Sequence, residues 1–236
     1  MEGSGIERGR RPVQRAILAV LVASALVPAA GCATESHRPL EPASVESRGT
    51  PFAGEKEVLG VAGFHNRSGY MTGVFSDGVD RLGNQARVLL RTHLSQSGRF
   101  SVLDRDNEEA LAAEAAAGGS DRVSLGAAYV VVGEVTSFGR RETGDHILFG
   151  LAGRGKSQVA YARVSLNVVD VRTSEVVHAV QGAGEYELGD REFLGTGGSS
   201  GYDATLGGKV LDLAVREAVN RLVEGREKGE WGGARP

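Results

Sequence analysis

The residues that could most directly carry chemistry in this sequence lie between Gly150 and Ser157. Gly150-Leu-Ala-Gly-Arg-Gly-Lys-Ser157 fits the pattern G-x-x-x-x-G-K-[ST], in which backbone N–H groups and a lysine bind nucleotide phosphates. That site needs a helix directly after the loop, because the helix N-terminus holds the anion. The residues after Ser157 instead alternate apolar and polar side chains, as in a strand. The pattern therefore predicts the glycine-rich tip of a β-hairpin, and we expect no nucleotide to bind there.

Other chemistry-bearing residues are scattered. The five histidines form no HxH or HxxxH pair, and no G-x-S-x-G elbow presents a nucleophilic serine. Glu108 and Glu109 fit the first turn of a helix, where the dipole favours negative charge, better than acid–base catalysis. One cysteine excludes an internal disulfide and a cysteine-based zinc site. We expect no metal, no cofactor and no enzymatic activity.

The single cysteine, Cys32, lies at the end of an N-terminal leader. A basic stretch that contains Arg8 and Arg15 precedes an apolar run from Ala16 to Ala30, which is too short for a membrane-spanning helix and suits a signal peptide. Ala29-Ala30-Gly31-Cys32 resembles the bacterial lipoprotein box, although the family usually has Leu at the first position. The resemblance implies that Cys32 carries a diacylglycerol and a fatty acyl chain such as palmitate. An ordinary secretory signal with a chance cysteine is the alternative.

Composition describes an ordinary globular chain with many glycines. Of 236 residues, 41% are hydrophobic and 24% charged, which excludes a fully disordered or polytopic membrane protein. The formal charge of −3 provides no field for nucleic acid, so we expect no nucleic-acid partner. The 35 glycines are about twice average usage, which points to turns and hairpins.

Hydrophobic periodicity divides the chain into four parts. Residues 1–31 form the predicted signal peptide. Residues 32–54 form a flexible tether rich in Ser, Glu and Pro, and residues 226–236 form a flexible tail. Residues 55–225 form one α/β (α+β) domain, a mixed sheet flanked by helices. Its predicted strands are 57–64, 100–103, 128–135, 160–168 and 176–180, and its predicted helices are 86–97, 107–117 and 205–224.

Four segments together resemble the curli-secretion lipoprotein family, CsgG-like proteins that include the holdfast-anchoring HfaB relatives. They are the strand that exits through Phe64-His-Asn66, Gly98-Arg-Phe-Ser-Val-Leu-Asp-Arg105, Gly126-Ala-Ala-Tyr-Val-Val-Val-Gly-Glu-Val135 and Leu166-Asn-Val-Val-Asp-Val-Arg-Thr-Ser-Glu-Val-Val177. The resemblance covers about residues 57–223.

The resemblance implies a homo-oligomeric ring that is lipid-anchored in the outer membrane, faces the periplasm and exports or anchors fibre or adhesin proteins. Each subunit would donate two glycine-rich hairpins, near residues 136–160 and 178–205, to a transmembrane β-barrel. A loop after the first strand would narrow the channel, with Tyr70, Met71 and Phe75 as the candidate constriction residues.

The charges in both hairpin regions favour a second interpretation. Arg140-Arg-Glu-Thr-Gly-Asp145 would place charges on both faces of a barrel strand, and the second region is also rich in charge. A lipid-exposed charge near the centre of the bilayer costs about 2–4 kcal/mol. The alternative is a lipid-anchored periplasmic binding or scaffold lipoprotein without a pore.

Overall fold

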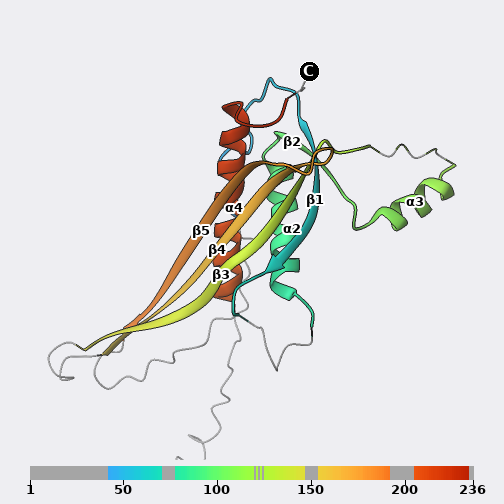
Figure 1. The fold of residues 1–236 in the computed structure, drawn as a ribbon. Helices are drawn as coiled ribbons and strands as arrows, with labels where there is room; N and C mark the ends of the chain where they lie inside the picture. The colour runs from blue at the N-terminus through green and yellow to red at the C-terminus, as the bar shows by residue number, and fades with distance from the viewer. Residues whose placement is uncertain are drawn as a thin grey trace, which may run out of the picture. The chain divides into compact units, whose positions relative to one another are not determined.

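The computed structural model describes residues 42–70, 78–119, 121, 123, 125–146, 154–191 and 205–233. Apart from Pro42, these residues belong to the compact unit Ala43–Pro236. Its strands form one sheet in the order β2-β1-β3-β4-β5 (Figure 1). The strands are β1 (Glu57–Asn66), β2 (Phe100–Leu103), β3 (Tyr129–His146), β4 (Arg154–Asp170) and β5 (Val176–Arg191); the helices are α2 (Arg81–Gln96), α3 (Glu108–Ala117) and α4 (Thr205–Glu227). The predicted mixed sheet with helices is confirmed.

The sheet is parallel at one side and antiparallel at the other. β1 runs parallel to both of its neighbours, β2 and β3. β4 is antiparallel to β3 and β5. This mixture follows from the connections: helices join the parallel strands, whereas a turn that begins after Asp170 joins β4 to β5.

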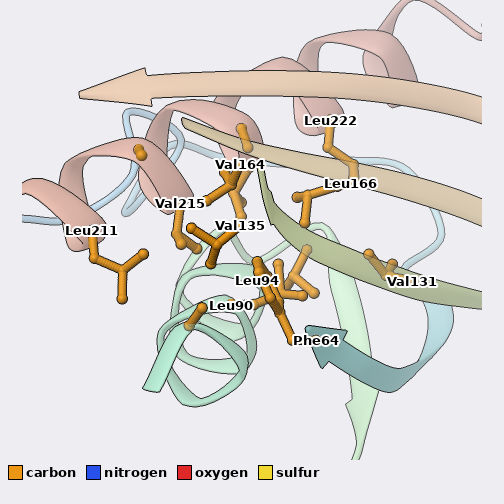
Figure 2. Close-up of a cluster of buried hydrophobic side chains, with 14 of the residues drawn as sticks. Phe64, Leu90, Leu94, Val131, Val135, Val164, Leu166, Leu211, Val215 and Leu222 are labelled. Atoms are coloured by element: carbon orange, nitrogen blue, oxygen red, sulfur yellow. The ribbon is translucent and has the colours of Figure 1, made fainter. Parts of the chain in front are cut away.

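The hydrophobic core lies between one face of the sheet and the helices α2 and α4. Val131 and Val135 of β3 and Val164 and Leu166 of β4 alternate toward this face and are fully buried. Figure 2 shows them facing side chains of both helices, among them Leu90, Leu94, Leu211, Val215 and Leu222. Each such side chain contributes about 1.5–3 kcal/mol through burial, so this seam fixes the position of the sheet.

Glycines in β5 allow α4 to approach the sheet closely. A Cβ added at Gly182 would overlap the carbonyl oxygen of Ala214 and would lie 2.5 Å from the amide nitrogen of Ala218. A Cβ at Gly184 would lie 2.8 Å from the carbonyl oxygen of Val210. The helix backbone therefore rests directly on the strand, and a larger residue would push it away.

The predicted helix that ends at Gly98 is confirmed and begins earlier, at Arg81. The Asp80 carboxylate caps it by accepting a hydrogen bond from the Gly83 amide at 2.7 Å. Gly98 adopts a left-handed backbone (φ 70°), which terminates the helix. Asn107, the predicted cap of α3, makes no capping bond, and its side-chain amide binds Asp104 at 2.6 Å instead.

The prediction of a flexible tether as far as residue 54 is wrong for its second half. Residues 43–52, which we name the strap, pack on the domain, and Val45 is 2% exposed. The buried Arg99 guanidinium donates to the carbonyl oxygens of Ser47 and Thr50. Arg99 also lies 4.9 Å from the centre of the Phe52 ring. The strap is ordered by polar contacts, which leave no apolar period in the sequence.

The prediction of a flexible tail from residue 226 is wrong as far as the described residues extend. α4 continues to Glu227, and Trp231 is 4% exposed. The indole stacks on Phe100 at 5.7 Å and donates to the carbonyl oxygen of Leu222 at 3.2 Å. Gly229 has a φ of 73° and turns the chain back so that Trp231 can reach the core.

Candidate functional site

Beyond the end of β1 the sheet continues as a three-stranded extension, which we name the arm. It comprises Ser137–His146 of β3, Arg154–Arg163 of β4 and Ala183–Arg191 of β5. β1 ends at Asn66, opposite Val135, and beyond this point β3 is paired only with β4. The pairing continues to His146 opposite Arg154 and to Gly155 opposite Arg191. In Figure 1 the three strands curve away together past the helices.

Aromatic packing anchors the root of the arm. Phe138 is 8% exposed, and its ring centre lies 4.6 Å from that of Tyr70. On the opposite face, the Tyr161 ring lies over Gly139, where a Cβ would be only 2.6 Å from the phenol oxygen. The β-bulge between Val135 and Ser137 marks the start of the arm, and bulges bend and twist the strand that carries them.

An ion pair extends this anchoring outward. Arg141 on β3 binds Glu185 on β5 at 2.9 Å and lies 6.0 Å from the centre of the Tyr161 ring. Both charged side chains are more than half exposed. A pair so exposed contributes about 0–1 kcal/mol, so it selects the strand register more than it adds stability.

The arm presents long strand edges to its surroundings. Among the described strands, β5 occupies one edge of the sheet along all sixteen of its residues. On the other side of the arm, β3 has no described neighbour except β4 after Val135. Strand edges of this length are templates for pairing with another chain, because their main-chain groups can extend the ladder.

Charges occur on both faces of the arm. Arg140 and Arg141 are consecutive in β3 and therefore point to opposite faces. Arg141 is exposed, whereas Arg140 is partly buried near the start of α4. This arrangement was predicted from the sequence, and it makes neither face of the arm uniformly apolar.

The structure agrees with the predicted hairpins only in part. Of the first, residues 136–160, the structure describes residues 136–146 and 154–160, which belong to the antiparallel pair of β3 and β4. Of the second, residues 178–205, the structure describes residues 178–191 as a single strand that pairs with β4, and residue 205 as the start of α4. Residues 192–204 lie outside the described part of the chain.

Of the four predicted site residues, the structure describes Tyr70. Its carbonyl oxygen accepts a hydrogen bond from the Asn66 side chain at 2.8 Å, and its ring is half-buried against Phe138. Asp80 accepts from the Asn66 amide at 2.7 Å and so holds the two ends of this loop together. Met71 and Phe75, like Cys32, lie outside the described residues.

The segment that fits the phosphate-binding pattern is only partly described. Gly150 to Gly153 lie outside the described part, and Arg154 to Ser157 begin strand β4. The strand predicted after Ser157 is confirmed, so this position provides no helix N-terminus for an anion. In the described ranges, no three His, Cys, Asp or Glu side chains gather as metal ligands would, and no helix combines the length and the apolar character needed to cross a membrane.

Sequence reasoning missed the seam between the strap and α4. Arg99 binds Glu227 at 2.8 Å as well as the strap, and the Glu46 amide donates to Asn220 at 3.1 Å. A hollow in this seam is lined by Glu46, Thr50, Arg99, Glu217 and Glu227. Arginine directly after the Gly98 stop was visible in the sequence, but nothing there indicated what it would bind.

The family described as "Curli production assembly/transport component CsgG" matches residues 41–233. A Neisseria meningitidis serogroup B protein named "Putative lipoprotein NMB1126/NMB1164" is 56% identical over 213 residues, which cover 90% of this chain and 96% of that protein.

Solved structures show weaker likeness. Lipoprotein GNA1162 from Neisseria meningitidis is 14% identical, with a TM-score of 0.35, and the match covers 73% of this chain and 99% of that one. A PelC L103M dodecamer from Paraburkholderia phytofirmans is 14% identical, with a TM-score of 0.33, over 70% of this chain and 86% of that one. At these TM-scores, nothing about assembly or function is transferred from either structure.

Proposed function

We propose, from the premise that this chain belongs to the family of the curli production assembly/transport component CsgG, that it is a lipid-anchored subunit of an export assembly in the outer membrane. Copies of the chain would form a ring and contribute their arms to a shared channel. Its cargo would be fibre or adhesin proteins that are exported or anchored at the cell surface. The lipoprotein box at Cys32 and a relative named as a lipoprotein support the anchor.

The observation that carries this proposal is the arm with strand edges on both of its sides. The described core residues of the arm, Phe138, Ala160 and Ala162, lie near its root, and the strands continue together beyond them. A self-contained domain does not need this outer part. When the edge of one copy pairs with the opposite edge of the next, the contact is head-to-tail, and such contacts form a ring when the rotation from copy to copy closes. The lipid anchor would hold the copies at the same membrane.

The constriction remains a prediction. Tyr70 packs against Phe138 at the root of the arm, so the loop that begins there emerges beside the strands that would form the channel wall. This position supports a role for the loop that holds Met71 and Phe75 in narrowing the entrance.

The test is single-channel conductance of the acylated, detergent-extracted protein in a planar bilayer. We expect steps of constant size, and we expect them to vanish when Gly144 to Lys156 are deleted. Arg141→Gln, which keeps the arm at full length, is the matched control and should still conduct. None of the described core residues lies between Gly144 and Lys156. An unchanged thermal unfolding midpoint would show that the domain remains folded.

The charges on both faces of the arm favour a second candidate, a scaffold lipoprotein without a pore. In that case the arms would pair with each other or with an envelope partner in the aqueous periplasm. A silent bilayer, with folded and membrane-bound protein, would support this candidate and overturn the channel.

A further inference from the structure

We propose that α3 of one copy docks onto the uncovered face of the sheet in a second copy, along a row of apolar residues that crosses all five strands. The inference rests on the proposed function, because it names a contact between neighbouring subunits of the same assembly. The docking of α3 involves the domain and not the arm, so it can be tested separately from the proposed channel.

The row follows from the strand register. Consecutive pairs join Leu103 of β2, Gly60 of β1, Val130 of β3, Val169 of β4 and Val176 of β5. Residues in register share one face of the sheet. Val131 and Val168, adjacent along the chain to Val130 and Val169, are fully buried under the helices, so the row lies on the opposite face. Its end at Val176 is 53% exposed.

The sequences of the parallel strands β1 and β3 indicate that this face of the sheet is buried against another element. β1 reads Val58-Leu-Gly-Val-Ala-Gly-Phe64, and β3 begins Tyr129-Val-Val-Val132. Such nearly continuous apolar runs are typical of strands that are buried on both faces. Strands with one face in water normally alternate apolar and polar residues, as Ala160–Val168 of β4 does. In the described residues, helices α2 and α4 cover only one face.

α3 has the properties of a missing cover. It has ten residues, and none of its side chains is buried. A helix this short is marginal in water unless it packs on something. Six of its residues are alanines, which allow a close approach from any side, and the single large apolar side chain, Leu111, is 45% exposed.

Ion pairs at the base of α3 direct it away from its own uncovered face. Asp104 binds Arg91 at 3.0 Å, and Asp106 binds Arg87 at 3.1 Å. Both arginines lie on α2. Arg105 also donates to the carbonyl oxygen of Leu125 at 2.6 Å. This hydrogen bond joins the two ends of the connection between β2 and β3 that contains α3. α2 packs on the covered face of the sheet. The ion pairs to α2 therefore hold the start of the β2–β3 connection on the covered side, away from the apolar row of the same copy. A second copy is the partner that fits.

The charge of α3 also supports its docking beside the row. α3 carries three glutamates and no basic residue. A hollow beside the row, where β1 and β3 begin and β4 ends, is lined by Lys56, Val58 and Arg172, and also by the acidic residues Glu55, Glu57 and Asp170. Lys56 and Arg172 are exposed, and neither forms an ion pair with another described residue. The acidic helix would therefore meet two available cations beside an apolar track.

The test is cross-linking between two differently tagged copies of the full-length acylated protein, one with Leu111→Cys and the other with Val176→Cys. Both positions are exposed, so the cysteines should be tolerated, and the sulfur of acylated Cys32 is already blocked. After co-expression, a short bismaleimide should link the two tags at least tenfold more than a matched pair with Ser95→Cys on α2 in place of Leu111→Cys.

The outcomes separate the two proposals. If native mass spectrometry in mild detergent shows the oligomer but no link forms between the tags, the docking of α3 is overturned and the assembly stands. If a single chain with both cysteines links only to itself, α3 covers its own sheet and the proposal is also overturned. A monomeric mass contradicts both. Leu111→Glu should weaken the oligomer and leave the unfolding midpoint unchanged.

Discussion

At the scale of single residues, Arg99 connects segments that are far apart in the sequence. Its guanidinium is almost fully buried and joins the end of α2, the strap and the last turn of α4. The Thr50 hydroxyl accepts a further hydrogen bond from it at 2.7 Å. A buried cation is stable only when such partners surround it, so the strap and Arg99 depend on one another.

Replacing this arginine should release the strap. We expect Arg99→Met to lower the free energy of unfolding by about 2–4 kcal/mol, because several charge-assisted hydrogen bonds to buried groups are lost. Trypsin should then cleave after Arg48 faster than in the unaltered protein. Arg221→Met, which breaks only the exposed pair with Glu217, should cost about 0–1 kcal/mol and leave cleavage unchanged. Equal cleavage rates in both variants would refute the clamp.

Asp104 gives the base of α3 a dependence on pH. The hydrogen bond from the Asn107 side chain and the charge of Arg91 hold the pKa of Asp104 below its ordinary value. Folding therefore favours the ionised form, and its contribution is complete above about pH 3.9 and is lost as pH falls through the lowered pKa. The Asn107 side-chain amide should titrate by NMR with a midpoint below 3.9, and Asp104→Asn should abolish the transition. A midpoint above 3.9 would contradict this assignment.

At the scale of elements, the contact between α4 and β5 depends on glycine. We expect Gly182→Ala to cost about 1–3 kcal/mol, measured by urea unfolding, because the added methyl group overlaps the α4 backbone. Gly126→Ala meets no atom within 4 Å and serves as the control, with a change of less than about 1 kcal/mol. A similar loss in both would show that backbone entropy, and not the close approach, sets the cost.

The elements of the core were predictable because their side chains repeat. The alternation from Ala160 to Val168 identified β4, and the apolar stripe of residues 206–222 identified α4. The arm was harder to predict, since its glycines and charges hide the strand period, and its extent is set by pairing with β3 and β5. Val45 and Trp231 were missed for a related reason: a single apolar residue in a polar segment has no period.

The site was less predictable than the fold. A resemblance supplied Tyr70, Met71 and Phe75, and the structure places Tyr70 at the root of the arm. The clamp at Arg99 and the apolar row could not be foreseen, because both arise from register and from contacts between segments far apart in the sequence.

At the scale of the whole molecule, the proposed membrane anchor would depend on one atom, the Cys32 sulfur. We expect Cys32→Ser to prevent acylation, so that the protein appears in the soluble periplasmic fraction or remains uncleaved. Cell fractionation measures the share of the variant in the soluble and membrane fractions, with the unaltered protein as reference. Continued recovery with the outer membrane would refute the lipid anchor.

The docked strap changes how copies of the protein would find one another. Buried Val45 lies thirteen positions after Cys32 in the sequence, and an extended chain of thirteen residue steps spans about 45 Å. If the strap did not pack on the domain, the flexible tether would extend from Cys32 to the start of β1 and would be almost twice as long. With the proposed anchor at Cys32, a short tether would keep every domain in a thin layer beside the bilayer, where copies would meet by diffusion in two dimensions. Assembly could then proceed at copy numbers far too low for association in bulk solution.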